Sequence, residues 1–321
     1  MEREMLTTAE AAAYLRAHDR YLILTHKRPD GDTLGCAAAL CRMLRGIGKT
    51  AALLPNNEVT ERYASYVEGL WAAEEYAYDI VVSVDVAAVT LLPDNAVPFS
   101  ERIDLAFDHH PTYEGFARRA CVRHACAACG ELLCEVAVEL GQLTAETALP
   151  LYVAVATDTG CFVYSNVTAS THRVAAALIE TGIDFRRVNK ELFRTRTRKR
   201  LALEGRLLRE MEFFDDGRIV VVQVPQALIR ELSLSENDMD DLASLGGLVE
   251  GQDCAVTMKE QENGAWKISV RTGPRIDASQ VCARFGGGGH RAAAGCVIEG
   301  RSGEEAKRAL VAACVEAGAH A

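Results

Sequence analysis

The stretch THKRPDGDTLGCAAAL, residues 25–40, joins the end of an apolar run to the predicted start of a helix. The run YLILTH, residues 21–26, is apolar almost throughout, as expected for a strand covered on both faces. The small and apolar residues that follow, 33–49, predict a helix that ends near two glycines. The predicted strand ends at His26, and the loop before the predicted helix contains Asp30 and Asp32. Charged residues are therefore concentrated where the strand ends and the helix begins.

The same alternation continues through the first half of the chain. Further apolar runs lie at 50–55, 78–85 and 102–110, and helical patterns follow at 127–140, 144–156 and 170–181. Continuously apolar strands separated by helices are typical of an α/β fold with a mostly parallel sheet flanked by helices.

The sequence pattern changes after residue 205. Short strands are expected at 217–225, 254–260 and 266–272, with an Asn-Gly turn between the last two, and a helix at 303–318. We therefore expect a catalytic domain at 1–185, a helical connector at 186–205 and a smaller C-terminal α/β domain at 206–321.

The amino-acid composition is that of a globular protein and argues against some functional classes. The 321 residues are 49% hydrophobic and 25% charged, as in ordinary globular proteins. The net charge of -10 argues against a protein that binds nucleic acid mainly through a basic surface. No apolar run approaches the length of a membrane span. The N-terminus reads as a capping box, Thr7 with Glu10, rather than an export signal, so we expect a cytoplasmic protein with reduced cysteines.

Two motifs allow competing interpretations. The stretch CVRHACAACGELLC, residues 121–134, could bind zinc through Cys121, His124, Cys126, Cys129 and Cys134, but zinc motifs repeat a close cysteine pair at a distance and only one such pair stands here. We favour small residues that pack the start of a helix. The basic run RTRTRKR, residues 194–200, is either a surface for a polyanion or the solvated face of the connector.

Acidic and histidine residues gather where the predicted strands end. Those at or near segment ends are His26, Asp30, Asp32, Asp85, Asp108, His109, His110 and Asp158. The carboxyl ends of parallel strands meet at one edge, where unpaired carboxylates would repel one another. Bound cations offset that repulsion, and mixed carboxylate and imidazole ligands suit manganese or magnesium, with zinc, cobalt or iron as alternatives. These ligands are too many for one ion, and their number suits two ions about 4 Å apart. We expect Gly31 to turn the backbone sharply, so that Asp30 and Asp32 face different ions.

A second group of candidate binding residues lies in and near the stretch FGGGGHRAAAGC, residues 285–296. Consecutive glycines weaken strands and helices, but they let backbone N–H groups approach an anion. His290 follows them, and Arg271 ends a predicted strand. We expect phosphate binding here, with a flexible loop as the alternative.

These motifs resemble those of a known family. HKRPDGD, SVD, DHH and TDTG stand in the order found in DHH-family phosphoesterases, and FGGGGHRAAAG resembles the associated DHHA1 domain. The length and two-domain plan are similar to the bacterial nanoRNase and 3′-phosphoadenosine 5′-phosphate (pAp) phosphatase group.

The resemblance implies a role for each matching residue. His26, Asp30 and a bridging Asp85 would hold the first ion, and Asp32, Asp85, His109 and Asp158 the second. His110 would contact the scissile phosphate or orient the site, with Asp108 as a supporting residue. The substrate pocket would use Arg271, Gly287, Gly288, Gly289 and His290. The ions would be two divalent cations, usually Mn²⁺, with Mg²⁺ or Co²⁺ as alternatives.

The implied function is hydrolysis of short oligoribonucleotides to nucleoside 5′-monophosphates, of pAp to AMP, or of both. The alternatives are a cyclic or linear dinucleotide phosphodiesterase and a non-catalytic nucleotide-binding regulator, which the intact ligand set argues against. The expected partner is short RNA or a small nucleotide, with no membrane; the oligomeric state, including a homodimer, is left open.

Overall fold

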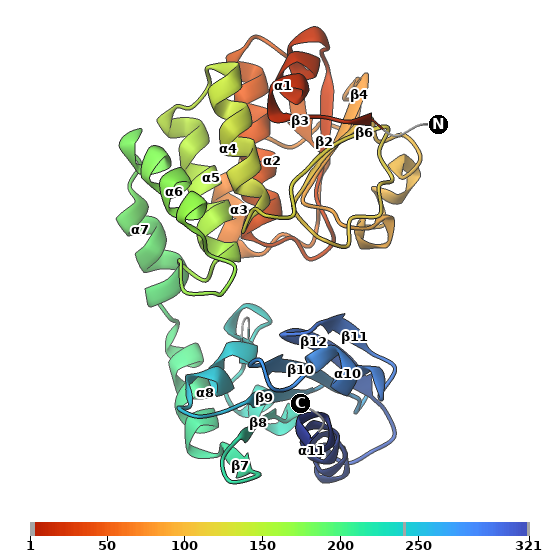
Figure 1. The fold of residues 1–321 in the computed structure, drawn as a ribbon, viewed down its shortest axis with the longest axis vertical. Coiled ribbons are helices and arrows are strands. Elements are labelled where there is room, and N and C mark those ends of the chain that lie inside the picture. Colours follow the sequence, from red (N-terminus) through yellow and green to blue (C-terminus); the bar gives the residue numbers. More distant parts are fainter. Residues whose placement is uncertain (1–3, 240–241, 320–321) are drawn as a thin grey trace. The chain divides into compact units, whose positions relative to one another are not determined.

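The computed structural model describes residues 4–239 and 242–319, and the chain divides into two compact units after Thr195 (Figure 1). The connector expected at 186–205 spans this division. Its first part, α7 (Phe185–Asn189) and a π-helical turn (Lys190–Arg194), lies in the first unit. Its second part, α8 (Arg198–Arg209), lies in the second.

The first unit contains a six-stranded sheet in the order β1-β6-β5-β4-β2-β3, and every strand pair in it is parallel. The strands are β1 (Glu4–Met5), β2 (Tyr21–Leu24), β3 (Ala51–Leu53), β4 (Ile80–Val84), β5 (Leu105–Asp108) and β6 (Arg119–Val122). The central strands β2, β4 and β5 are buried along their whole length. The parallel α/β sheet predicted from continuous apolar runs is therefore confirmed.

Helices cover one face of this sheet (Figure 1). They are α1 (Thr8–Ala17), α2 (Gly31–Gly46), α3 (Glu61–Val67), α4 (Cys129–Leu140), α5 (Ala145–Asp158) and α6 (Ala169–Glu180). The predicted capping box of Thr7 and Glu10 opens α1. The other face packs against a segment with two 3-10 turns, Val89–Leu91 and Val97–Phe99. None of the helices in the described residues has both the length and the apolar character needed to cross a membrane.

Gly31 has a different role from the one expected. It is the first residue of α2, with Asp30 as the N-cap whose Oδ1 accepts from the N–H groups of Asp32 and Thr33. A Cβ at Gly31 would lie 2.4 Å from Oγ1 of Thr157 on α5. The predicted sharp turn is therefore wrong: the glycine allows α2 and α5 to approach closely.

The second unit contains a mixed sheet in the order β11-β12-β10-β9-β8-β7, in which only the β8–β9 pair is parallel. The strands are β7 (Glu212–Phe214), β8 (Ile219–Val224), β9 (Cys254–Glu260), β10 (Trp266–Thr272), β11 (Gly288–His290) and β12 (Ala293–Ile298). Helices α10 (Ala278–Ala283) and α11 (Gly303–Ala319) pack on one face. On part of the other face lie α8, α9 (Gln226–Glu231) and a 3-10 segment, Leu242–Leu248; a further 3-10 turn spans Asn237–Met239.

The cysteines of the 121–134 stretch are core residues. Cys121 lies in β6, Cys129 begins α4, and both are buried, as are Cys126 and Cys134. His124 is exposed. These positions agree with the packing interpretation of the stretch.

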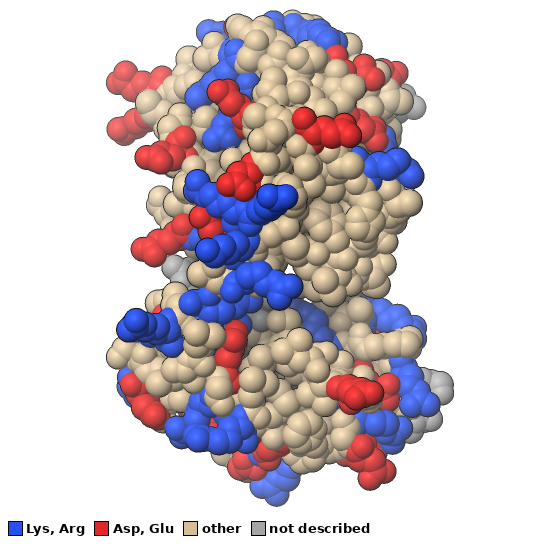
Figure 2. Space-filling model, turned by 90° about the vertical axis from the view of Figure 1, so that its left-hand side faces the viewer, with Lys and Arg blue, Asp and Glu red and all other residues tan. Residues whose placement is uncertain are grey.

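The basic run 194–200 has a mixed environment. Arg200 is buried, and its Nε donates to Glu204 at 2.6 Å while its Nη1 donates to the Asp238 carbonyl. Arg194 and Arg198 are exposed. Figure 2 shows groups of Lys and Arg side chains on the surface of each unit, interspersed with acidic ones. The exposed members fit both a polyanion surface and a solvated face, so both interpretations stay open for them, whereas Arg200 belongs to the fold.

Candidate metal centre

The acidic and histidine residues predicted from the sequence meet at the carboxyl ends of the central strands. His26 follows β2, Asp85 follows β4, and Asp108 ends β5. Helix α2 begins beside Asp30, and α5 ends at Asp158. Three groups of potential ligand atoms result, each within 4.8 Å of one another: Asp85, His109 and His110; His26, Asp30 and Asp85; and Asp32, His109 and Asp158.

One side of the cluster is built around His26. Its Nε2 lies 3.6 Å from Asp30 Oδ1 and 3.9 Å from Asp85 Oδ2. Its Nδ1 lies 2.8 Å from the Lys27 carbonyl oxygen. A proton on Nδ1 donates to that carbonyl and leaves the Nε2 lone pair facing the carboxylates, which is the arrangement of a metal-binding histidine.

The other side is built around His109. Its Nε2 lies 3.2 Å from Asp158 Oδ2, 3.5 Å from Asp85 Oδ1 and 3.7 Å from Asp32 Oδ2. Its Nδ1 lies 3.1 Å from the Cys126 carbonyl oxygen, which orients the ring in the same way. Asp85 thus presents one oxygen to His26 and the other to His109, as a residue between two ions would.

Asp85 is held in a strained conformation. Its φ is +57°, in the left-handed region, where non-glycine residues are uncommon. Its N–H donates to the Phe107 carbonyl at 2.8 Å, and the residue is only 3% exposed. Such strain persists where the surroundings fix it, and it aims this carboxylate into the cluster.

Asp32 is fixed by a helix that the sequence did not connect with it. The N–H groups of Cys129 and Gly130, at the start of α4, donate to its two carboxylate oxygens at 2.7 and 3.0 Å. The Cys36 thiol lies 3.2 Å from Oδ1. A helix N-terminus stabilises a carboxylate, so α4 holds this fully buried group in place.

Asp108 positions His110. Its Oδ1 accepts from the His110 N–H at 2.6 Å and lies 2.8 Å from His110 Nδ1. Asp108 is fully buried, whereas 31% of the His110 side chain is exposed. The Asp108 contact engages Nδ1 and leaves Nε2 as the second polar atom of the ring. This geometry agrees with Asp108 supporting His110.

The clustering perturbs the pKa values of these groups. Burial, and then the charges of Asp32 and Asp30, raise the pKa of Asp85 well above its usual range. Burial and the charge of Asp158 raise the pKa of Asp32 to about 7. For His109, burial acts to lower the pKa, but the Asp158 carboxylate 3.2 Å from Nε2 and the charge of Asp32 raise it to about 9. A cation among these groups would relieve the repulsion.

The residues fit divalent cations. Asp85 Oδ1 and His109 Nε2 are buried, face each other and have no hydrogen-bond partner in the described residues. Leaving such atoms unpartnered is costly, and a metal ion satisfies both. Carboxylate oxygens with imidazole nitrogens are ligands for manganese, magnesium or zinc.

The second unit places Arg271 and His290 in one row. Arg271 on β10 and His290 on β11 both lie opposite Ala293 of β12 in antiparallel register. Directly opposed residues share a face of the sheet, so the two side chains flank Ala293 with Cα atoms about 10 Å apart. Both are exposed, as expected for groups that bind a ligand rather than a core.

The four glycines are not a simple loop, because Gly288 and Gly289 belong to β11. The Gly287 N–H donates to the Cys282 carbonyl at 3.0 Å, and a Cβ there would lie 2.2 Å from the Gly295 carbonyl oxygen. Gly287 therefore lies packed against β12, whereas Gly288 has open space where a Cβ would stand.

Comparison with known proteins identifies the two units. Residues 20–159 match the DHH family, N-terminal domain, and residues 216–317 match the DHHA1 domain. The bifunctional oligoribonuclease and PAP phosphatase NrnA of Thermus thermophilus is 30% identical over 92% of this chain and 89% of its own length. The chain belongs to the DHH family. It is a hydrolase that acts on phosphodiester or phosphate bonds, as the members of this family are.

Solved structures support the same fold. An exopolyphosphatase-related protein from Bacteroides fragilis superimposes with a TM-score of 0.86 at 20% identity, covering 98% of this chain and 97% of that one. RecJ from Thermus thermophilus, solved with Mn²⁺, superimposes with a TM-score of 0.51 at 16% identity, covering 96% of this chain and 55% of RecJ. The order of a DHH unit followed by a DHHA1 unit therefore matches the expectation from the sequence.

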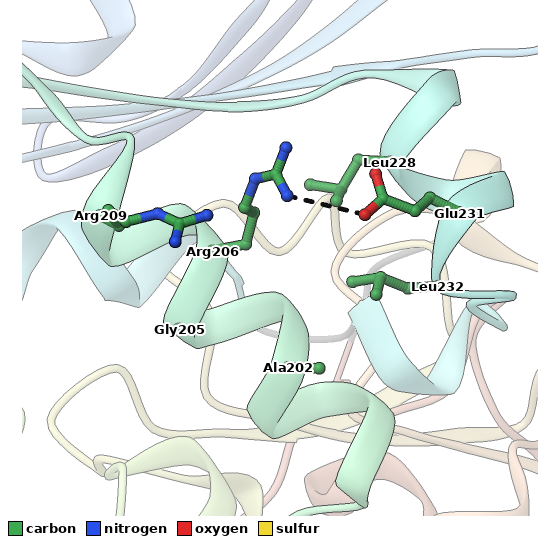
Figure 3. Close-up of a pocket in the computed structure, with 7 residues that line it drawn as sticks. All are labelled: Ala202, Gly205, Arg206, Arg209, Leu228, Glu231 and Leu232. Carbon is green, nitrogen blue, oxygen red and sulfur yellow. Dashed lines mark ion pairs between the residues drawn. The ribbon is translucent and has the colours of Figure 1, made fainter.

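A pocket in the DHHA1-containing unit lies apart from these residues. It has a volume of about 290 Å³ between α8 and α9, and an ion pair of 3.6 Å joins Arg206 to Glu231 across it (Figure 3). Its lining includes none of the residues predicted to bind metal or substrate. The functional assignment therefore rests on the metal cluster of the DHH unit.

Proposed function

We propose that this DHH-family phosphoesterase hydrolyses short oligoribonucleotides to nucleoside 5′-monophosphates and pAp to AMP, using two divalent cations, by preference Mn²⁺. The observation that carries the proposal is Asp85, whose two oxygens face the His26 group and the His109 group separately. The name of the Thermus thermophilus relative supports the substrates, and the Mn²⁺ found with RecJ supports the metal.

His26, Asp30 and Asp85 would hold one cation, and Asp32, Asp85, His109 and Asp158 the other. When bound, these cations supply activation of water at neutral pH and neutralise charge on the phosphoryl oxygens.

The chain's own residues would orient the reacting groups. His110, held through Nδ1 by Asp108, would present Nε2 to a non-bridging oxygen of the scissile phosphate, where charge builds as the bond breaks. The strained backbone at Asp85 and the α4 N–H groups on Asp32 fix both carboxylates before substrate arrives.

The DHHA1 residues would capture the substrate. Arg271 and His290 flank Ala293 on one exposed sheet face and would bind a terminal phosphate of pAp or of an oligonucleotide. Gly288 and Gly289 would let that phosphate approach the β11 backbone closely. An acidic protein thereby gains a local site for an anion.

A substrate panel tests the proposal. Purified protein with Mn²⁺ is given pAp, diribonucleotides, an RNA pentamer, cyclic di-AMP and pyrophosphate, and the values of kcat/KM are compared. Highest efficiency on pAp or RNA dimers is expected. Highest efficiency on cyclic di-AMP or pyrophosphate would overturn the substrate assignment. Nucleotide binding without turnover of any substrate would support a regulator instead.

The remaining expectations stay predictions. A cytoplasmic location and a homodimer are tested by fractionation of cells and by light scattering of the purified protein. The preference for Mn²⁺ over Mg²⁺ or Co²⁺ is tested by reconstituting metal-free enzyme with each ion.

A further inference from the structure

The loop after Asp158 is held in an unusual backbone conformation. Gly160, Cys161 and Phe162 have φ values of +55°, +57° and +68°, so three successive residues occupy the left-handed region. Cys161 and Phe162 carry side chains, for which this region is unfavourable. A conformation of this kind persists only where its surroundings fix it, and it concentrates at functional sites.

The loop is fastened to Asp158 and to the segment whose backbone orients His109. Asn166 Nδ2 donates to the Asp158 carbonyl and to the Ala127 carbonyl, each at 3.0 Å. Ala127 adjoins Cys126, whose carbonyl orients His109. The N–H groups of Val163 and Tyr164 both donate to the Thr159 carbonyl. The loop is therefore built against the metal centre.

The strained backbone turns one aromatic ring inward and another outward. Phe162 packs on the core and stacks against His172, with ring centroids 5.5 Å apart at 26°. Val163 and Tyr164 point away from the core, with exposed fractions of 79% and 48%. The Tyr164 ring lies against Gly160, because a Cβ there would be 2.4 Å from the ring. The half-exposed Tyr164 ring thus lies against a residue that is two positions from Asp158.

We propose that Tyr164 is the residue on which the nucleobase of the substrate stacks, with Val163 extending its apolar edge. This inference rests on the proposed function, because it takes the substrate to be a nucleotide. Stacking on an aromatic side chain accepts every base, so it suits an enzyme that degrades short RNA of any sequence. It also adds affinity for nucleotides over other phosphate esters.

The test separates base binding from phosphate chemistry. Binding of AMP and of ribose 5-phosphate is measured by calorimetry in the presence of Mn²⁺, and hydrolysis is measured for pAp and for its abasic analogue, ribose 3,5-bisphosphate. Tyr164→Ala should weaken AMP binding and raise the KM for pAp about tenfold, with kcat changed little. Both abasic ligands should be affected less than twofold, and Tyr164→Phe should behave as wild type.

Phe213→Ala is the matched control, because Phe213 is a 55% exposed aromatic residue on β7 and should leave every value unchanged. An equal loss for AMP and ribose 5-phosphate, or a fall in kcat with both substrates, would assign Tyr164 a structural role and overturn the proposal. Unchanged AMP binding in Tyr164→Ala would also overturn it. A wild-type protein that binds AMP but hydrolyses neither pAp nor RNA would refute the proposed function, while the binding arm would still decide the role of Tyr164.

Discussion

The two regions proposed to bind metal and substrate are built in opposite ways. In the DHH unit, Asp32 and Asp85 are almost completely buried, and each is fixed by backbone hydrogen bonds. In the DHHA1 unit, Arg271 and His290 stand exposed on the open face of a mostly antiparallel sheet. Burying carboxylates together is unfavourable without a cation, whereas exposed polar side chains carry no such cost. This difference supports the proposal that the buried region holds the reacting groups in a fixed geometry and the exposed region binds and releases substrate.

The largest expected effect comes from Asp85. Asp85→Asn keeps the shape of the side chain but removes the negative charge shared by both groups of ligands. We expect kcat for pAp to fall by at least about 10³-fold, and less Mn²⁺ to bind per chain. Steady-state kinetics and metal analysis of the dialysed protein check this.

Asp94→Asn is the control, because Asp94 is an exposed aspartate of the same unit and should leave both values unchanged. An Asp85→Asn enzyme with normal kcat would refute the bridging role of Asp85. Catalysis would then not depend on the buried cluster of the DHH unit.

The next largest effect is expected from substitutions in the exposed region of the DHHA1 unit. Arg271→Ala and His290→Ala should each raise the KM for pAp roughly 10- to 100-fold, because each removes a charge-assisted hydrogen bond to phosphate. The metal content and the kcat should change little. Lys267→Ala is the control, since Lys267 lies on β10 with the same outward direction as Arg271 but four residues away. A loss of kcat with unchanged KM would break the division between the two regions.

The elements that the sequence predicted well are those with a local signal. Continuous apolar runs predicted β2, β4 and β5, and the aspartates and histidines that follow them do converge. Since strand ends of a parallel sheet meet at one edge, no knowledge of distant contacts was needed.

What the sequence could not supply is contact between distant residues. The strand β6 was hidden in a stretch interpreted by its cysteines, and the two N–H groups of α4 that hold Asp32 lie about a hundred positions away along the chain. Gly31 was assigned a turn, because its spacing from Thr157 is visible only in the folded protein. Likewise, the short pairing of β11 with β12 overrides the low strand propensity of glycine.

A smaller effect should appear in the stability of the metal-free protein. The pKa of Asp32 is raised to about 7 from a usual value of about 4, so its protonated form favours folding, and this contribution is lost as the pH rises through about 7. The pKa of His109 is raised to about 9 from about 6.5, so its charged form favours folding, and this contribution is lost between those values. The pKa shifts of Asp32 and His109 both lower the stability of the metal-free protein as the pH rises. The thermal midpoint in EDTA should therefore fall by several degrees between pH 6 and 9.

Mn²⁺ binds the deprotonated ligands, so saturating Mn²⁺ should raise the midpoint most at the alkaline end. Asp32→Asn removes one of the titrating groups and part of the charge acting on His109, so its decline in EDTA should be shallower. A metal-free midpoint that increases towards pH 9 would contradict the view that the buried region is unfavourable without cations.

The smallest effect should distinguish packing from ligand binding among the glycines of the exposed region. Gly288 has open space where a Cβ would stand, whereas a Cβ at Gly287 would overlap the Gly295 carbonyl. Gly287→Ala should therefore lower the thermal midpoint of the protein, and Gly288→Ala should leave it unchanged. If phosphate approaches the β11 backbone, Gly288→Ala should still raise the KM for pAp a few-fold, because the added methyl group stands between the backbone and the ligand. Unaltered kinetics in stable Gly288→Ala protein would limit the capture of phosphate to the side chains of Arg271 and His290, since the backbone of β11 would then have only a structural role.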